Sequence, residues 1–244
     1  MPQGSPGTLP RLDDMWLTVD GLRLHALASI AAGEHRPAVV LVHGVAVSSR
    51  NMRPTAEAFA SRCRVFSPDL PGHGRSDSPR HVLGVRALAD SLAGWIAAAA
   101  LDRPVLLGNS FGCQIIAEMA ARHPDRLRAA VLQGPTPDAA ARSWLRQLWR
   151  WFVNGSREGA TQPSVAMHDW RDAGLRRLVG TAHHSIRDRI EENLPHVTVP
   201  SLVVRGERDP IVSQRWAETV AALVPAGELL VMPQATHTIT TNPS

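Results

Sequence analysis

The chain has 244 residues, of which 44% are hydrophobic and 20% are charged. A chain of this length can bury one substantial core, and its composition excludes a disordered or fibrous protein. All 26 basic residues are arginines and the net charge is only +4. Because these arginines are scattered among acidic residues rather than gathered in a stripe, we expect no nucleic-acid partner.

Signals for export or membrane insertion are not expected from this sequence. Residues 1–10 lack the basic and apolar regions of a signal peptide, and the longest apolar run, residues 92–101, is too short to cross a bilayer. Cys63 and Cys113 lie in apolar surroundings without a metal-ligand or disulfide pattern. We therefore expect a cytoplasmic protein with reduced thiols and no membrane partner.

The first predicted elements form a hairpin, because two alternating apolar runs within residues 15–29 are joined by Asp20-Gly21. Short runs that are apolar at nearly every position follow, and each closes on small or polar residues. Runs of this kind predict strands buried on both faces, as in a parallel sheet. They are AVVLVHG (38–44), CRVFSPD (63–69), PVLLGNS (104–110), RAAVLQG (128–134), SLVVRGE (201–207) and ELLVMP (228–233).

Apolar residues recur at helical spacing between these runs, which predicts helices over residues 52–60, 85–100, 111–122 and 213–223. Strands that alternate with helices over most of the chain indicate an α/β protein with a mostly parallel, doubly wound sheet. In such sheets ligands bind beyond the carboxyl ends of the strands. The residues that follow each strand are therefore the first candidates for a functional site.

One segment interrupts this alternation. Residues 136–196 contain no strand-like run, show helical spacing, and carry four of the seven tryptophans: Trp144, Trp149, Trp151 and Trp170. We interpret the segment as a helical cap inserted after the sixth strand. Residues 1–135 and 197–244 would then form the two parts of the body. Trp144 and Trp149 are candidate substrate contacts, although packing of the cap onto the body is an alternative role for these tryptophans.

Ser110 lies in Gly108-Asn109-Ser110-Phe111-Gly112, after an apolar strand and before a predicted helix. The G-x-S-x-G pattern alone is weak, but this context gives it a physical meaning. A sharp turn from strand to helix needs small flanking residues, and it exposes the serine hydroxyl at a helix N-terminus. The alternative is that Ser110 is an ordinary helix N-cap.

A serine hydroxyl becomes a good nucleophile only when a base removes its proton, and that base needs an orienting acid. Asp209 follows one predicted strand in RGERDPIV, and His237 follows the next in QATHTIT. Each residue also has an ordinary structural interpretation. The order Ser, Asp, His, with each residue at a strand end, favours a catalytic group of three.

These stretches resemble the α/β-hydrolase superfamily, in the branch of capped esterases and meta-cleavage hydrolases. The resemblance rests on LVHGVAVSS, DLPGHGRSDSP, GNSFG, VPSLVVRGERDPIV and ATHT, within residues 39–237. It implies that Ser110 is the nucleophile, that His237 is the general base and then acid, and that Asp209 holds the imidazole. We expect no cofactor and no metal, because the sequence has no phosphate-binding, dinucleotide-binding or zinc-binding motif.

The resemblance also implies an oxyanion hole made by the backbone N–H groups of Val45 and Phe111. His43 and Gly44 would shape the loop beside that hole. His43, Gly44 and Asn109, together with the two cap tryptophans named above, are the candidate substrate contacts.

The predicted function is hydrolysis of a carboxylic ester, or a related acyl bond, of a small and largely apolar molecule. A C–C bond hydrolase of the meta-cleavage type is an alternative, because those enzymes share Asn109 before the nucleophile, although they generally have Trp where this chain has Thr238. A second alternative is a ligand receptor with little or no turnover on the same fold.

Members of the superfamily usually continue past the catalytic histidine into a helix that closes the sheet, whereas this sequence ends seven residues after His237. The closing helix is therefore expected to be absent. Either the protein covers that face by other means, such as pairing as a homodimer, or the natural product is longer.

Overall fold

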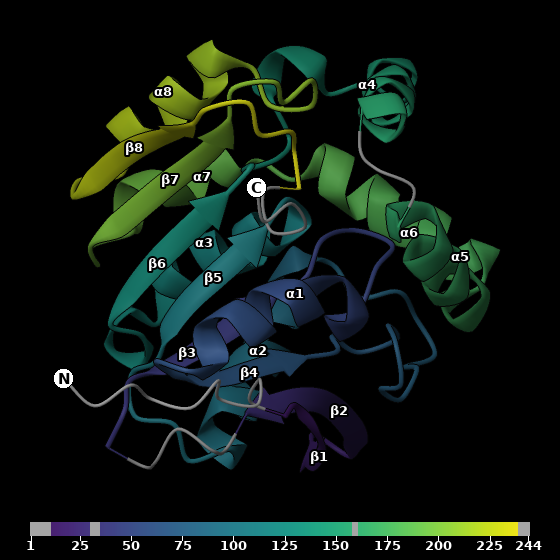
Figure 1. Ribbon diagram of the computed structural model, residues 1–244, viewed down its shortest axis with the longest axis vertical. Helices are drawn as coiled ribbons and strands as arrows, with labels where there is room; N and C mark the ends of the chain where they lie inside the picture. Colours follow the sequence, from purple (N-terminus) through teal and green to yellow (C-terminus); the bar gives the residue numbers. More distant parts are fainter. Residues whose placement is uncertain (1–10, 30–34, 158–160, 239–244) are drawn as a thin grey trace, which may run out of the picture.

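The computed structural model describes residues 11–29, 35–157 and 161–238, and these form one mixed sheet flanked by helices (Figure 1). The strand order is β1-β2-β4-β3-β5-β6-β7-β8. β2 pairs antiparallel with β1 and with β4, and the other neighbouring strands are parallel. The predicted fold class, an α/β protein with a mostly parallel sheet, is therefore confirmed.

The predicted hairpin consists of β1 (Asp13–Val19) and β2 (Leu22–Ser29). Asp20 and Gly21 form its turn with φ values of 49° and 77°. Such a turn matches the twist of the two strands, and aspartate and glycine tolerate the left-handed backbone better than most residues.

All six apolar runs form the strands predicted from them. Many of their side chains are buried on both sides of the sheet, as expected for parallel strands covered by helices. The strands are β3 (Ala38–Val42), β4 (Arg64–Pro68), β5 (Val105–Asn109), β6 (Ala129–Gln133), β7 (Ser201–Gly206) and β8 (Gly227–Met232).

Helices pack on both faces of the sheet. α1 (Ser49–Ala60) packs against one side of β3, where Met52 and Ala56 join Val39 and Leu41 in one apolar cluster. α2 (Val85–Ala98), α3 (Phe111–Arg122) and α8 (Gln214–Leu223) pack on the other side in the main core. These four helices agree with the predicted ones to within three residues at each end.

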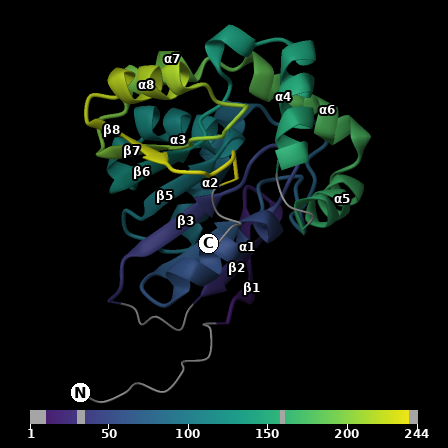
Figure 2. The same cartoon turned by 45° about the horizontal axis from the view of Figure 1, so that its top comes forward.

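Three longer helices lie between β6 and β7: α4 (Trp144–Arg157), α5 (Thr161–Ala173) and α6 (Leu175–Arg187). They lie together at the side of the sheet toward which β5 and β6 point (Figures 1 and 2). We call α4, α5 and α6 the cap; the division of the chain at residues 135 and 196 stays a prediction. The short helices are η1 (Pro124–Arg126), η2 (Ala139–Ala141), α7 (Ile190–Asn193) and η3 (Leu194–His196).

The face of β8 that turns away from α8 is partly open within the described part of the chain. Leu229 packs toward the main core, whereas the next residue, Leu230, is 44% exposed. The expectation of an absent closing helix concerns residues after Thr238 and lies outside the described residues.

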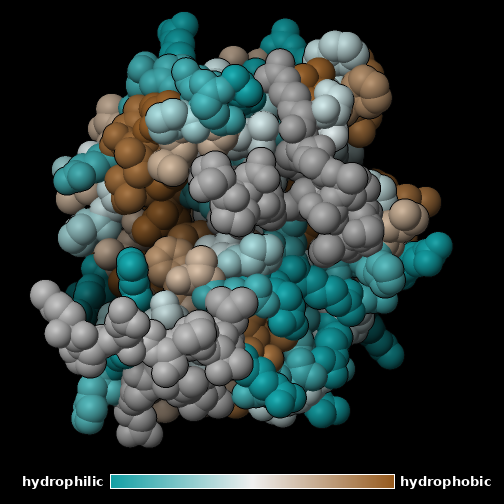
Figure 3. Space-filling view, in the orientation of Figure 1, coloured by the Kyte–Doolittle hydropathy of each residue, from teal (hydrophilic) through white to brown (hydrophobic). Residues whose placement is uncertain are grey.

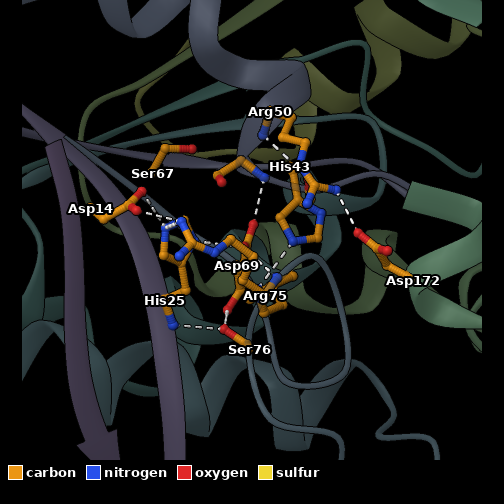
Figure 4. A network of polar contacts seen from close by, with 12 residues as sticks. Asp14, His25, His43, Arg50, Ser67, Asp69, Arg75, Ser76 and Asp172 are labelled. Atoms are coloured by element: carbon orange, nitrogen blue, oxygen red, sulfur yellow. Dashed lines mark hydrogen bonds and ion pairs between the residues drawn. The ribbon is translucent and has the colours of Figure 1, made fainter. Parts of the chain in front are cut away.

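A buried carboxylate at the end of β4 organises the loops near the functional edge of the sheet (Figure 4). Asp69 accepts hydrogen bonds from the backbone N–H groups of Ser49 at 2.7 Å and Arg75 at 2.9 Å, and lies 2.8 Å from His25 Nδ1. Burial alone would raise the pKa of Asp69, but its hydrogen bonds to His25 and to the backbone hold that pKa below its usual value. One carboxylate thereby joins β2, the start of α1 and the loop after β4.

Two buried histidines near this loop, His43 and His73, are held in the neutral form. His43 Nε2 accepts a hydrogen bond from the backbone N–H of Leu70 at 3.1 Å, so its Nδ1 carries the proton and donates to the Gly44 carbonyl at 2.9 Å. The rings of His43 and His73 lie 5.1 Å apart. Burial lowers the pKa of His43, and burial together with His43 lowers the pKa of His73 to about 3.

We predict that these histidines make the protein less stable in mild acid. The folded-state pKa of His73 lies below its ordinary value of 6.5, so the unfolded chain binds a proton first as the pH falls. Between pH 7 and pH 5, His73 alone should remove about 2 kcal/mol from the free energy of unfolding. Urea unfolding of the wild type and of His73→Gln at both pH values measures the difference. The variant should lose less stability over this interval; an equal loss in both proteins would refute the assignment.

Candidate active site

Ser110 occupies a strained turn between β5 and α3. Its φ of 54° and ψ of −111° fall in a region that non-glycine residues rarely adopt, at a cost of about 1–3 kcal/mol. Two hydrogen bonds hold this conformation: the Ser110 N–H donates to the Gln133 carbonyl at 2.9 Å, and the Cys113 N–H donates to the Ser110 carbonyl at 3.0 Å. The turn presents the hydroxyl at the first residues of α3, as the sequence predicted.

Gly112 permits this turn because α3 begins directly against β3. A Cβ atom at Gly112 would lie 2.3 Å from the Val42 carbonyl oxygen, a separation that no side chain can occupy. The second glycine of the motif is therefore required by close packing between a helix and a strand.

Asp209 and His237 form a buried pair at the ends of β7 and β8. His237 Nδ1 lies 2.8 Å from Asp209 Oδ2, and Asp209 Oδ1 accepts from the backbone N–H groups of Ile211 at 2.7 Å and Val212 at 3.0 Å. Burial alone would raise the pKa of Asp209, but His237 and the two amides lower it below its usual value. An ionised carboxylate therefore fixes the proton of His237 on Nδ1 and directs Nε2 to the opposite side of the ring.

Ser110 and His237 both contact the segment at the end of β6. The Gln133 carbonyl accepts from the Ser110 N–H, and the Gln133 side-chain amide donates to the His237 carbonyl at 3.3 Å. Gly134 follows with φ of 58°, and a Cβ atom there would lie only 2.7 Å from His237 Cε1. Ser110 and His237 thus both contact residues 133–134, although 127 positions separate them in the chain.

Arg205, which sequence reasoning missed, holds the loop that carries Asp209. Its buried guanidinium donates to the carbonyl groups of Val212 at 2.8 Å, Glu207 at 3.2 Å and Asp209 at 3.2 Å. An arginine inside an otherwise apolar run was the only signal of this role, and it did not identify the partners.

The loop after β3 lies beside Ser110. A Cβ atom on Gly44 would be 3.5 Å from Ser110 Cβ, so the backbone of residues 43–45 passes next to Ser110. His43 is buried and holds this loop through its hydrogen bonds to Leu70 and Gly44. Val45 is partly buried and packs against the main core. Phe111, whose N–H is the first of α3, is fully buried.

A chain of polar contacts that sequence reasoning also missed connects Ser110 to the cap. Ser110 Oγ lies 3.4 Å from Thr136 Oγ1, which accepts from Gln114 Nε2 at 3.3 Å. The same Gln114 nitrogen donates to Ser185 Oγ on α6 at 2.9 Å. All four side chains are buried. Because Gln114 lies one helical turn after Ser110, its spacing offered a signal, but its partners lie far away in the sequence.

The other predicted substrate contacts lie in different surroundings. Asn109 is buried beside Gly44, with its Oδ1 3.2 Å from the position of a Gly44 Cβ. Trp144 and Trp149 lie on α4 and are 36% and 66% exposed. Their role as substrate contacts stays a prediction. Among the residues that the structure describes, no group of three or more His, Cys, Asp or Glu side chains is arranged to hold a metal ion.

Comparison with known proteins gives relatives for most of the chain. The 2-(acetamidomethylene)succinate hydrolase of Mesorhizobium japonicum is 26% identical over 227 residues, which cover 82% of this chain and 81% of the relative. The 2-hydroxy-6-oxo-2,4-heptadienoate hydrolase of Pseudomonas putida is 38% identical over 100 residues, covering 39% of this chain and 36% of that enzyme. A solved structure of a serine hydrolase involved in carbazole degradation superimposes with a TM-score of 0.79 at 21% identity, covering 95% and 94% of the two chains.

Two family descriptions match the sequence. One, described as a TAP-like protein, matches residues 180–244. The other, described as the alpha/beta hydrolase fold, matches residues 37–167, more than half of the chain, and includes the turn that carries Ser110. The chain therefore belongs to the α/β-hydrolase fold family.

Proposed function

We propose that this protein is a serine hydrolase that cleaves a carboxylic ester, or a closely related acyl bond, of a small and largely apolar substrate. The observation that carries the proposal is the buried Asp209–His237 pair, which abuts the same segment as the strained turn of Ser110. A pair of this kind activates a hydroxyl without a metal or a cofactor.

The reaction would begin when Ser110 Oγ attacks the carbonyl carbon while His237 Nε2 takes the hydroxyl proton. Asp209 stabilises the imidazolium through the Nδ1–H hydrogen bond. The carbonyl oxygen then carries a negative charge, which the N–H groups of Phe111 and Val45 stabilise. Collapse of this intermediate breaks the ester C–O bond, and His237 returns its proton to the leaving alkoxide.

The second half of the reaction repeats these roles with water. The acyl group is now an ester of Ser110, and His237 takes a proton from an incoming water molecule as its oxygen attacks. The same two N–H groups stabilise the second oxyanion, and the acid leaves as Ser110 recovers its proton. The strained backbone of Ser110 keeps its Oγ at the N-terminus of α3 through both steps.

Replacement of Ser110 by alanine should abolish ester hydrolysis. Removal of a nucleophilic serine costs roughly 10⁴-fold to 10⁶-fold in turnover. Hydrolysis of p-nitrophenyl acetate and butyrate measures the loss, and a fluorophosphonate probe should label the wild type but not Ser110→Ala. Ser156→Ala, on the exposed side of α4, is the matched control and should be labelled normally. A folded wild type that neither hydrolyses a broad ester panel nor reacts with the probe would contradict the proposal and favour a binding function.

Replacement of Asp209 by asparagine should lower kcat while leaving KM nearly unchanged. An asparagine side-chain amide can donate to Nδ1 and thereby favour the wrong tautomer of His237. The same change in another Ser-His-Asp triad lowers kcat about 10⁴-fold. Steady-state kinetics on the best p-nitrophenyl ester would test this, with thermal unfolding as the check on folding. If kcat stays within a few-fold of the wild type, Asp209 does not orient the base.

C–C bond hydrolysis is a second candidate, favoured by two observations. The relative that acts on 2-hydroxy-6-oxo-2,4-heptadienoate is 38% identical over 100 residues, and Asn109 lies buried directly before the nucleophile. Turnover of that dienoate ketone, followed by the loss of its visible absorbance, would separate the two activities. We expect kcat/KM to be higher for the esters; a higher value for the ketone would replace the ester proposal while keeping Ser110 as the nucleophile.

A further inference from the structure

α4 exposes a continuous apolar face. Its large side chains at positions 144, 145, 148, 149 and 152 repeat with helical spacing and therefore share one side of the helix. Figure 3 shows hydrophobic residues gathered in the region of α4. The exposed fractions are 36% for Trp144, 83% for Leu145, 52% for Leu148, 66% for Trp149 and 71% for Phe152. A run of large apolar side chains on one exposed helix face usually marks an interaction site.

The opposite side of α4 holds the helix in this orientation. Gln147 is buried and donates to the Ala141 carbonyl at 3.0 Å, and Arg150 bonds to Asp138 at 2.9 Å and to the Ile211 carbonyl at 2.6 Å. Trp151 packs against the main core. Rotation of α4 to hide its apolar face would break all of these contacts, so the exposure is built into the fold.

The neighbouring cap helices extend this character. Met167 and Trp170 on α5 and Leu175 and Val179 on α6 are each at least half exposed. Leu175 and Val179 also line an apolar groove against Val82. Large exposed apolar residues thus occur on all three cap helices, which lie together on one side of the molecule (Figure 2).

The charges of the cap indicate what covers this surface. Arg146 on α4 and Arg176 and Arg187 on α6 are exposed, and neither helix contains an aspartate or a glutamate. In a symmetric pair of chains α4 would face α4, because such an interface joins the same patch on both subunits. The exposed Arg146 of one chain would then approach Arg146 of the other, and α4 has no acidic residue to pair with it. A negatively charged surface has no such conflict.

We infer that the exposed face of α4 docks the protein on the surface of a bilayer that contains anionic phospholipid. A helix with Trp, Phe and Leu on one face and arginines beside them lies in the plane of the lipid headgroups. This inference is independent of the proposed hydrolase activity. It revises the expectation that the protein has no membrane partner. Surface docking needs no membrane-spanning helix, and none of the described helices has the length and apolar character of one.

The test compares binding to vesicles of two compositions. The full chain is sedimented with vesicles of equal parts phosphatidylcholine and phosphatidylglycerol, and separately with vesicles of phosphatidylcholine alone. We expect the protein to sediment with the anionic vesicles, to bind the neutral ones more weakly, and to lose binding as salt is added.

The decisive variant is the double substitution Leu145→Gln and Phe152→Gln, which should reduce sedimentation by more than about tenfold. The matched control replaces Phe59 and Leu230 by glutamine, because these residues are also partly exposed but lie on α1 and β8. Thermal unfolding establishes that both double variants are folded. Ester hydrolysis by the wild type is measured separately, so a failure of docking and a failure of the proposed function are distinguishable.

Three results would overturn the inference. The wild type would remain in the supernatant with anionic vesicles, or the α4 variant would sediment as well as the wild type. Alternatively, light scattering would show a dimer of the wild type that the α4 variant fails to form, which would identify a second copy as the occupant of this face.

Discussion

The hydrogen bond from the Ser110 N–H to the Gln133 carbonyl continues the ladder between β5 and β6 one residue beyond the last strand residue of β5. It holds Ser110 in a backbone conformation that the residue would not adopt alone. It also fixes the position of residues 133–136 relative to Ser110. Since Gln133 and Gly134 in turn contact His237, the geometry of the whole site depends on this extension of the parallel sheet.

Two buried carboxylates in this fold, Asp69 and Asp209, stay ionised for the same physical reason. Asp69 and Asp209 both follow strands, both lose water, and both accept two backbone N–H groups besides a histidine. In each case these contacts outweigh the cost of burial and keep the carboxylate charged. Asp69 joins β2, the start of α1 and the loop after β4, whereas Asp209 lies behind the proposed base, so the surroundings of the histidine decide the difference in role.

The strands and helices could be predicted from the sequence because each one is indicated by residues that are close together in the chain. The turn at Asp20-Gly21, the six apolar strands and the helix from Phe111 to Arg122 depend on neighbouring residues, and the structure confirms them. The placement of Ser110 between strand and helix was predictable for the same reason. Arg205, Gln133 and Gln114 could not be identified, because their roles depend on carbonyl and hydroxyl partners that only the folded chain brings together.

The orientation of α4 was likewise beyond local patterns. Helical spacing reveals that one side of this helix is apolar, but spacing does not show which side faces the protein. The tryptophans of the cap illustrate the difference: Trp151 packs on the core, whereas Trp149 stacks against Phe152 on the exposed side. The hydrogen bonds of Gln147 and Arg150 determine which side of α4 faces the protein.

Ile211 joins the cap to the candidate active site through its two backbone groups. Its N–H binds the Asp209 carboxylate, and its carbonyl accepts from Arg150 on α4. One peptide segment therefore connects α4 with the carboxylate that binds His237. Displacement of α4 would therefore break the contact between Arg150 and Ile211 or shift the peptide segment that binds the Asp209 carboxylate.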